Sequence, residues 1–156
     1  MKVFISHKNE DSALALAIRN AFTKNGVTSY LDILDSSIIS DGKALTDHIK
    51  NNLNECSDII VVMSETTKLS WWVPFEIGMS AQVDMPTASF LNSEVALPSY
   101  LSYWPRLETI RDIDKYVAIR RQTEQAFIYK YGRNSLATSK AIETKAFYDA
   151  LKLQLR

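Results

Sequence analysis

One short segment constrains the fold of this chain more than any other. The run Ile59–Met63 (IIVVM) is apolar throughout, with no polar residue at alternate positions. A strand with one face in water would alternate apolar and polar residues, so this unbroken run indicates a strand that is covered on both faces. Such strands are typical of parallel sheets with helices on either side. The segment therefore predicts an α/β protein with Ile59–Met63 as its central strand.

Strand-like and helix-like segments alternate around this run. The opening KVFIS predicts a first strand that ends near Ser6, and apolar residues recur at helical spacing after each strand. The expected order up to residue 91 is a helix at Asp11–Asn25, a strand at Val27–Leu31, a helix at Lys43–Glu55, the central strand, a helix at Trp71–Val83 and a strand at Pro86–Leu91. This alternation predicts a flavodoxin-like three-layer sandwich with a parallel sheet of about five strands, plus C-terminal helices.

The C-terminal part, residues 92–156, has a weaker pattern. A fifth strand is expected at Leu107–Arg111, followed by helices at Ile113–Tyr131 and Ser139–Gln154. In the last helix we expect one buried side, made up of Ile142, Ala146, Phe147, Ala150 and Leu151. A length of 156 residues fits one domain with a single core, so residues 1–156 are expected to form one unit.

Composition argues against several classes of function. Lysine plus arginine and aspartate plus glutamate each number 18, so the net charge is zero and no nucleic acid partner is expected. A single cysteine cannot form an internal disulfide. One cysteine and two histidines are also too few ligands for a Cys/His zinc site, so no metal is expected. There is no signal-peptide pattern and no apolar run near the roughly 20 residues that span a bilayer. We therefore expect no membrane association and a cytoplasmic location.

A glutamate among apolar residues is the main candidate for a functional site. Glu76 lies in SWWVPFEIG (residues 70–78), where Pro74 fits only the first turn of a helix and so places the helix start at Trp71 or Trp72. The helix dipole favours a carboxylate near this end as the anion, which offsets part of the cost of burying it. Trp72 precedes Glu76 by four residues, so its indole can wall one side of the carboxylate and suit a flat cationic group.

The loops after the first three strands are expected to meet at one edge of the sheet, where ligands of such folds bind. A structural explanation of the same segment stays open, because Glu76 could simply complete a helix N-terminus and its aromatic neighbours could be ordinary core residues. We expect His7 in a loop, His48 on a helix surface and Cys56 in the core.

Three motifs within residues 2–91 resemble those of TIR domains. KVFISHKNED resembles the first TIR motif, in which a strand ends in a serine and an acidic residue follows, here Ser6 and Asp11. SWWVPFEIG resembles the TIR segment in which tryptophan and glutamate, here Trp72 and Glu76, open the helix after the third strand. CSDIIVVMS is similar to that third strand itself. The resemblance implies the same flavodoxin-like fold.

The resemblance also implies an activity on NAD. TIR enzymes cleave the bond between nicotinamide and ribose and depend on a glutamate at the position of Glu76, with NAD as substrate and no separate cofactor. Glu76 is then the expected catalytic residue. The residues expected to bind the substrate are Phe4, Ser6, His7, Lys8 and Trp72. Whether the product is ADP-ribose or a cyclic ADP-ribose isomer stays open at this point.

The small size of the chain is similar to that of stand-alone bacterial TIR proteins in antiphage systems such as Thoeris. This similarity implies a cyclic product that activates a separate effector protein.

Two other functions stay open. FEIGMSAQVDMP is also similar to the glutamate segment of nucleoside 2-deoxyribosyltransferases, which use a glutamate nucleophile at the same kind of carbon. A non-catalytic TIR interaction module is the other alternative. Self-association would then use the loop Asp35 to Lys43, with Ile38 and Ile39 as exposed anchors.

Overall fold

A parallel sheet forms the centre of the protein. The computed structural model describes residues 1–31, 41–70, 72–91, 95–97, 99–132 and 137–156. The strands in these residues are β1 (Lys2–Ser6), β2 (Thr28–Leu31), β3 (Asp58–Met63), β4 (Thr87–Leu91) and β5 (Arg106–Leu107). They pair in the order β2-β1-β3-β4-β5, all parallel. The central position predicted for the apolar run is confirmed, since β3 lies between β1 and β4.

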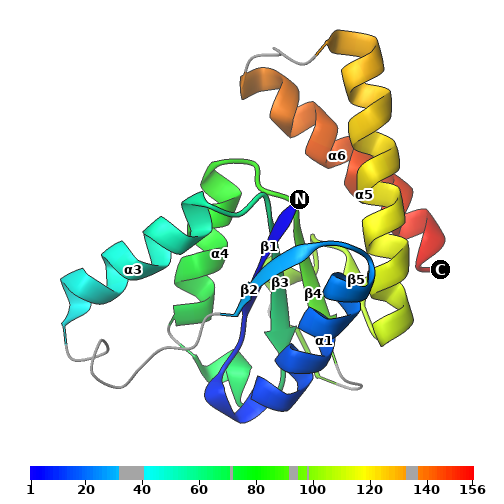
Figure 1. The fold of residues 1–156 in the computed structure, drawn as a ribbon. Helices are drawn as coiled ribbons and strands as arrows, with labels where there is room; N and C mark the ends of the chain where they lie inside the picture. Colours follow the sequence, from blue (N-terminus) through cyan, green and yellow to red (C-terminus); the bar gives the residue numbers. More distant parts are fainter. Residues whose placement is uncertain (32–40, 71, 92–94, 98, 133–136) are drawn as a thin grey trace.

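Helices cover both faces of this sheet. They are α1 (Ser12–Lys24), α3 (Gly42–Asn54), α4 (Trp72–Gln82), α5 (Ile110–Tyr131) and α6 (Ala137–Gln154), with 3-10 turns η1 (Asn9–Asp11), η2 (Thr67–Leu69) and η3 (Ser99–Leu101). Figure 1 shows α3 and α4 on one face and α1, α5 and α6 on the other. The predicted flavodoxin-like three-layer arrangement is confirmed. Within the described ranges, no helix has the length and apolar character needed to cross a bilayer.

Two apolar layers fill the space between the sheet and its helices. Ile60 and Val62 of β3 pack in one cluster with α1, α5 and α6, whereas Ile59, Val61 and Met63 pack in the other with α3 and α4. Successive strand residues point to opposite faces, so a strand with helices on both sides needs apolar residues at every position. This requirement explains the unbroken run in the sequence.

The strand predicted at Leu107–Arg111 is wrong beyond Leu107. The chain instead turns into α5 at Ile110, before the predicted start at Ile113. Thr109 and Asp112 form a capping box, in which the Thr109 backbone amide donates to the Asp112 carboxylate at 2.9 Å. A threonine followed three residues later by an acidic residue is a helix-start signal, and it outweighs the strand propensity of the short apolar stretch.

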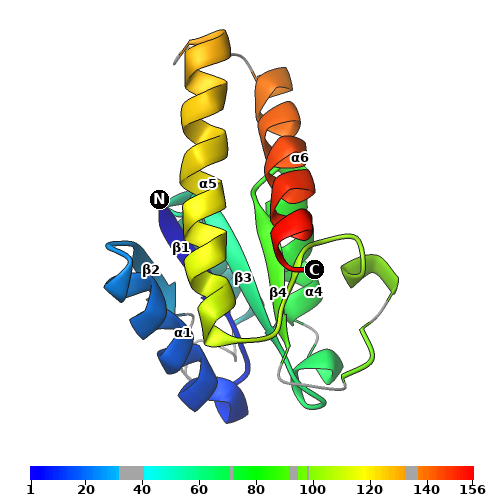
Figure 2. The same ribbon diagram turned by 90° about the vertical axis from the view of Figure 1, so that its right-hand side faces the viewer.

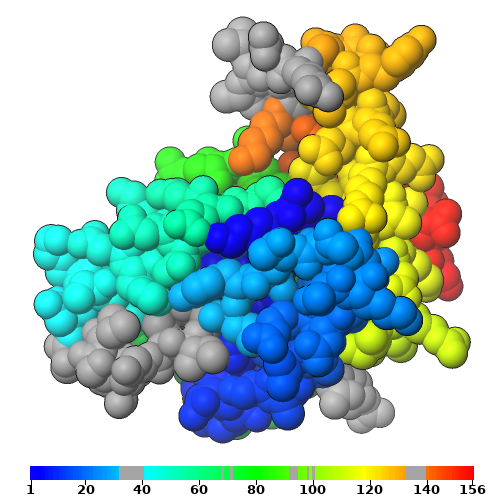
Figure 3. Space-filling model, viewed as in Figure 1, coloured from blue at the N-terminus to red at the C-terminus, as the bar shows by residue number. Residues whose placement is uncertain are grey.

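The buried side predicted for the last helix is partly wrong. Phe147 and Leu151 are fully buried as expected, but Ile142 is 52% exposed and Ala146 is also exposed. Both ribbon views show the C-terminal end of α5 and the start of α6 extending beyond the sheet, and the space-filling view shows the same end of α5 standing above the body (Figures 1, 2 and 3). The sheet therefore cannot cover the first turns of α6.

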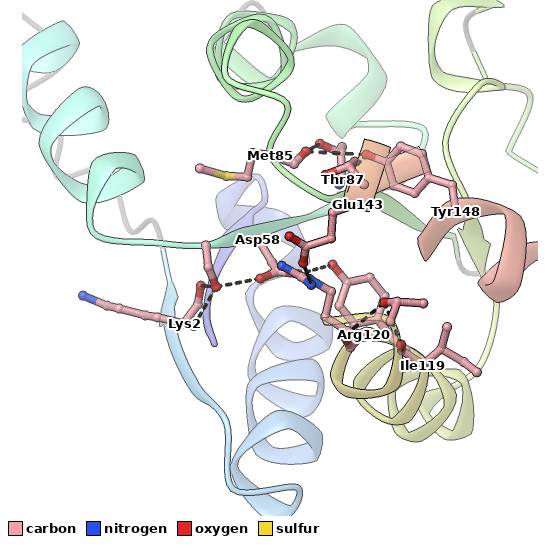
Figure 4. Close-up of polar contacts among 12 residues, drawn as sticks. Lys2, Asp58, Met85, Thr87, Ile119, Arg120, Glu143 and Tyr148 are labelled. Carbon is pink, nitrogen blue, oxygen red and sulfur yellow. Dashed lines mark hydrogen bonds and ion pairs between the residues drawn. The ribbon is translucent and has the colours of Figure 1, made fainter. Parts of the chain in front are cut away.

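A buried polar network fastens α5 and α6 to the amino end of β3. Asp58 is fully buried and accepts hydrogen bonds from Tyr116 Oη at 2.9 Å and from Arg120 Nε at 3.1 Å. The other side of the guanidinium donates to Glu143 at 2.6 Å, as Figure 4 shows. Burial by itself lowers the pKa of Arg120, but Asp58, Tyr116 and Glu143 together more than reverse this and raise the pKa above its ordinary value. Arg120 therefore stays charged between two carboxylates.

Candidate functional site

The segment around Glu76 begins a helix as predicted. Helix α4 starts at Trp72, whose backbone amide donates to Ser70 Oγ at 3.3 Å. Pro74 lies in the first turn, where its missing amide proton costs no helical hydrogen bond. Glu76 lies one turn into the helix and is only 2% exposed. The helix thus carries a carboxylate into an almost dry position.

Ser6 supplies a partner for this carboxylate. It is the last residue of β1, is fully buried, and donates its hydroxyl to Oε2 of Glu76. A buried carboxylate needs hydrogen-bond donors to replace the water it has lost, and a hydrogen bond to a charged acceptor is stronger than a neutral one. The pair joins the carboxyl end of β1 to α4, which is the edge where ligands of parallel α/β sheets bind.

Phe4 lies behind this pair in the core. Its side chain has no exposed surface, and its ring centroid is 5.4 Å from that of Tyr30. It belongs to the apolar cluster under α3 and α4. Its expected contact with a substrate stays a prediction, and such a contact would require the core around the ring to open.

His7 and Lys8 follow Ser6 in the loop at the same edge. Nδ1 of the half-buried His7 lies 3.3 Å from the carbonyl oxygen of Ile5. Lys8 Nζ lies 3.9 Å from the carboxylate of Glu10, and its side chain is 37% exposed. Both side chains are therefore accessible at the edge that holds Glu76, and their expected roles in binding stay predictions.

Trp72 is partly buried against the same apolar cluster as Phe4. Its ring lies at 84° to that of Phe75, with a centroid distance of 6.1 Å. Phe75 is exposed, so this edge-to-face pair places aromatic surface on the first turn of α4. The ring contact that the structure shows for the indole is with Phe75, and its expected packing against the substrate stays a prediction.

One polar cluster at this edge was missed by sequence reasoning. The carboxylate of Asp11 accepts hydrogen bonds from Ser64 Oγ at 2.6 Å and from the hydroxyl of Thr67. Asp11 is the N-cap residue of α1, in agreement with the predicted helix start, but its side chain makes no capping hydrogen bond. Its hydrogen bonds instead tie the loop after β1 to the loop after β3. The two hydroxyl residues that follow the central strand were the available signal, because these loops were expected to meet.

Cys56 and His48 were expected to have structural positions, in the core and on a helix surface, and the structure agrees fully for Cys56 and partly for His48. Cys56 is buried, and this burial raises the pKa of its thiol to about 11, as expected for a core residue. His48 is half-buried rather than fully on the surface of α3, because its Nε2 lies 3.0 Å from Tyr30 Oη.

No group of three or more metal-binding side chains gathers among the residues with described positions.

The predicted self-association loop, Asp35 to Lys43, lies largely outside the described residues, and Ile38 and Ile39 with it. From Asp41 onward the chain is described, and the carboxylate of Asp41 caps α3 by accepting from the amides of Lys43 and Ala44 at 2.9 and 3.1 Å. The end of this loop is thus tied to the helix that follows it.

The motifs, the parallel sheet and the position of Glu76 agree with a comparison against known families. A family model described as TIR domain matches residues 3–127. The chain belongs to the TIR domain family. A comparison with curated proteins found no significant match. The family match extends past the resemblance noted for residues 2–91, because it takes in β5 and most of α5 of this TIR domain.

Proposed function

We propose that this TIR domain cleaves the bond between nicotinamide and ribose in NAD, with Glu76 as its catalytic residue. The observation that supports this proposal is the hydrogen bond from Ser6 to the Glu76 carboxylate. It holds a nearly buried carboxylate in one orientation at the ligand-binding edge of the sheet. A group that is fixed before the reaction stabilises charge without having to reorganise during it.

The reaction needs electrostatic help at the ribose more than it needs an acid. When the bond from ribose C1′ to the ring nitrogen breaks, its electron pair moves to that nitrogen, and the cationic ring leaves as neutral nicotinamide. Positive charge then develops on the ribose. The Glu76 carboxylate stabilises this charge, either across space or as a nucleophile at C1′. In a dry site this interaction is much stronger than in water.

The other residues at this edge would position the substrate. Ser6 was predicted to bind the substrate, but it is fully buried against Glu76, so in this proposal it is a positioning residue that acts through Glu76. The aromatic pair of Trp72 and Phe75 offers a surface for the flat nicotinamide ring, which is cationic before cleavage. Lys8 and His7 lie at the rim, where the Lys8 ammonium would meet a phosphate of NAD.

Access to Glu76 controls the activity in this proposal. Because the residue is 2% exposed in the isolated chain, the substrate reaches its carboxylate only when the surrounding groups separate. Association of TIR domains through the predicted loop Asp35 to Lys43 would supply the free energy for this opening. We therefore expect low activity in dilute solution and a steep rise of specific activity with protein concentration.

The second step decides the product. Attack of water at C1′ gives ADP-ribose and a proton, whereas attack by an atom of the same molecule gives a cyclic ADP-ribose isomer. We propose the cyclic product, as a signal for a separate effector in antiphage defence. This part is tested with a protein-free filtrate of the reaction, added to a candidate effector. A filtrate that fails to activate any effector while nicotinamide is released would limit the function to NAD consumption.

The first test uses concentrated protein with NAD and product detection by mass spectrometry. Nicotinamide release should fall at least about 100-fold in Glu76→Gln, which keeps the shape but not the charge of the side chain. Ser6→Ala should lower kcat more than it changes KM, because it removes orientation rather than a substrate contact. The matched control is Glu124→Gln, which removes an exposed carboxylate from α5 and should retain full activity.

Three results would count against the proposal. Turnover by Glu76→Gln equal to that of the unmodified protein would remove Glu76 from the chemistry. No nicotinamide release at any protein concentration would favour a non-catalytic interaction module. Exchange of bases between deoxynucleosides, unaffected by NAD, would favour a nucleoside 2-deoxyribosyltransferase.

A further inference from the structure

A cavity lies at the opposite edge of the sheet from Glu76. Its volume is about 320 Å³, within the size range of small-molecule sites. It is lined by the turn between α4 and β4, by Tyr103 and Trp104 ahead of β5, and by one side of α6. The α4 to β4 turn leads into the amino end of β4, whereas Ser6 and Glu76 meet at the carboxyl end of β1.

The floor of this cavity is made of buried residues whose polar atoms are hydrogen-bonded within the protein. Met85, Thr144 and Tyr148 line it and are all buried. Their polar atoms are already used: Thr144 Oγ1 donates to the backbone oxygen of Asp84 at 2.8 Å, and Tyr148 Oη accepts from the amide of Thr87 at 2.8 Å. Figure 4 shows Tyr148 directed toward Thr87 and Met85. A ligand on this floor would meet the side chains of Met85 and Tyr148, with few polar atoms lacking a partner.

Aromatic rings form the walls. The Tyr103 ring is at 81° to the Trp104 ring and at 89° to the Tyr148 ring, with centroid distances of 5.9 and 6.2 Å. The faces of such rings carry partial negative charge and attract cations. Lys152, which lines the neighbouring cavity, already places its ammonium 5.3 Å over the Tyr103 ring. The molecule itself thus shows that a cation is accommodated on this ring.

Asp84 provides the charge at the rim, and its backbone conformation is unusual. The end of α4 is a Schellman motif, in which the amide of Met85 donates to the Ser80 oxygen at 3.0 Å and the amide of Asp84 to the Ala81 oxygen at 3.2 Å. The central residue of this motif has a positive φ, here 51°, and is usually glycine. An aspartate therefore occupies a position where glycine would be more stable.

Among the described residues, the side chain of Asp84 makes no contact that would compensate for this unfavourable backbone conformation. Its carboxylate makes no hydrogen bond or ion pair with any residue whose position is described, yet it lines the cavity. The other charged group on the rim, Lys145, is paired with Asp149 at 2.7 Å. The cavity thus combines electron-rich rings, a buried floor and a carboxylate that has no partner among the described residues.

We propose that this cavity binds a flat organic cation of the pyridinium class, with its ring against Tyr103 and Trp104 and its positive charge beside Asp84. An aromatic ring matches the flat walls and the buried floor, and a permanent positive charge satisfies both the ring faces and the carboxylate. This site is separate from the Glu76 site and does not depend on the proposed NAD cleavage.

The test is an NMR titration of the whole chain with N-methylpyridinium. Shift changes are expected at the backbone amides of Asp84, Met85 and Thr144 and at the indole NH of Trp104. Uncharged pyridine at neutral pH and tetramethylammonium should bind more weakly, since each lacks one of the two features. Benzoate, which has the flat ring and the opposite charge, should bind weakest. Equal or tighter binding of benzoate would overturn the proposal and assign the cavity to anions through Lys145.

Variants of Asp84 separate binding from folding. Asp84→Asn should weaken N-methylpyridinium binding by about three- to tenfold. Asp84→Gly should weaken it as much while raising the Tm, because glycine suits the positive φ. Undiminished binding by Asp84→Gly would refute a role for the carboxylate. Glu76→Ala should bind unchanged, and loss of binding there would assign the cation to the Glu76 site instead.

Discussion

Replacing Arg120 with leucine is expected to lower the free energy of unfolding by about 3 kcal/mol. Asp58 is fully buried and the side chain of Arg120 is 11% exposed, so water cannot take the place of the lost guanidinium. Removing one partner of a buried ion pair costs about 3–5 kcal/mol, because it leaves an uncompensated charge. Asp58 keeps its hydrogen bonds from Tyr116 and Ser57, which places the expected value at the lower end of this range.

Urea denaturation followed by circular dichroism would measure this loss. For a chain of this length, about 3 kcal/mol corresponds to a fall in Tm of about 6–12 °C. The matched control is Arg121→Leu, one residue further along α5. Arg121 is exposed and donates to the backbone oxygen of Asn25 at 2.8 Å, so its loss should cost less than about 1 kcal/mol.

A double variant tests the physical reason for the loss. Asp58→Asn combined with Arg120→Leu removes the stranded charge while keeping an acceptor for Tyr116. It should be more stable than Arg120→Leu alone by at least about 1 kcal/mol. The reasoning is refuted if Arg120→Leu is no less stable than Arg121→Leu, or if the two substitutions destabilise additively.

Three further predictions concern separate parts of the fold. Burial alone would raise the pKa of Asp112, but Lys115 and two backbone amides lower it below its ordinary value. The Asp112 carboxylate therefore stabilises the fold above a pH of about 4, and this contribution is lost as the pH falls through the folded-state pKa. The deficit of Asp112→Ala, about 1–2 kcal/mol at neutral pH, should therefore shrink in acid, and a deficit that is constant with pH in urea titrations would contradict this. Burial raises the pKa of the Cys56 thiol to about 11. The thiol should therefore react with a disulfide reagent at least about 100-fold more slowly in the folded protein than in urea, and equal rates would show that it is accessible. Asp11→Ala removes the link to Ser64 at the edge that holds Glu76. In the proposed cleavage of NAD it should lower kcat about tenfold with little change in KM, whereas an unchanged kcat would show that the link does not position the site.

Local patterns predicted the sheet and the start of the helix that carries Glu76. The run Ile59–Met63 could only be buried on both faces, and Pro74 could only lie in a first helical turn. Both conclusions depend on properties of the backbone and of apolar surface that hold wherever the segment lies in the fold. For this reason they were confirmed.

Predictions failed where the outcome depended on distant parts of the chain. Ile142 has helical spacing with buried residues, yet it is exposed because the start of α6 extends past the sheet (Figure 2). Asp11 lies at the start of α1 as predicted, but its own segment did not indicate that hydroxyls more than fifty residues away bind its carboxylate. No local pattern reports how far a helix extends or which side chains form hydrogen bonds where two loops meet.

The sequence by itself determined the α/β class, the central strand, the family resemblance and the choice of Glu76. Each of these follows from local patterns of residues, taken one segment at a time along the chain. Only the tertiary structure decided that Ser6 binds the Glu76 carboxylate, that Asp58 is paired with Arg120 and that Asp84 faces an aromatic cavity. Each of these brings together residues from segments far apart in the chain, and their positions are set by packing of the whole core.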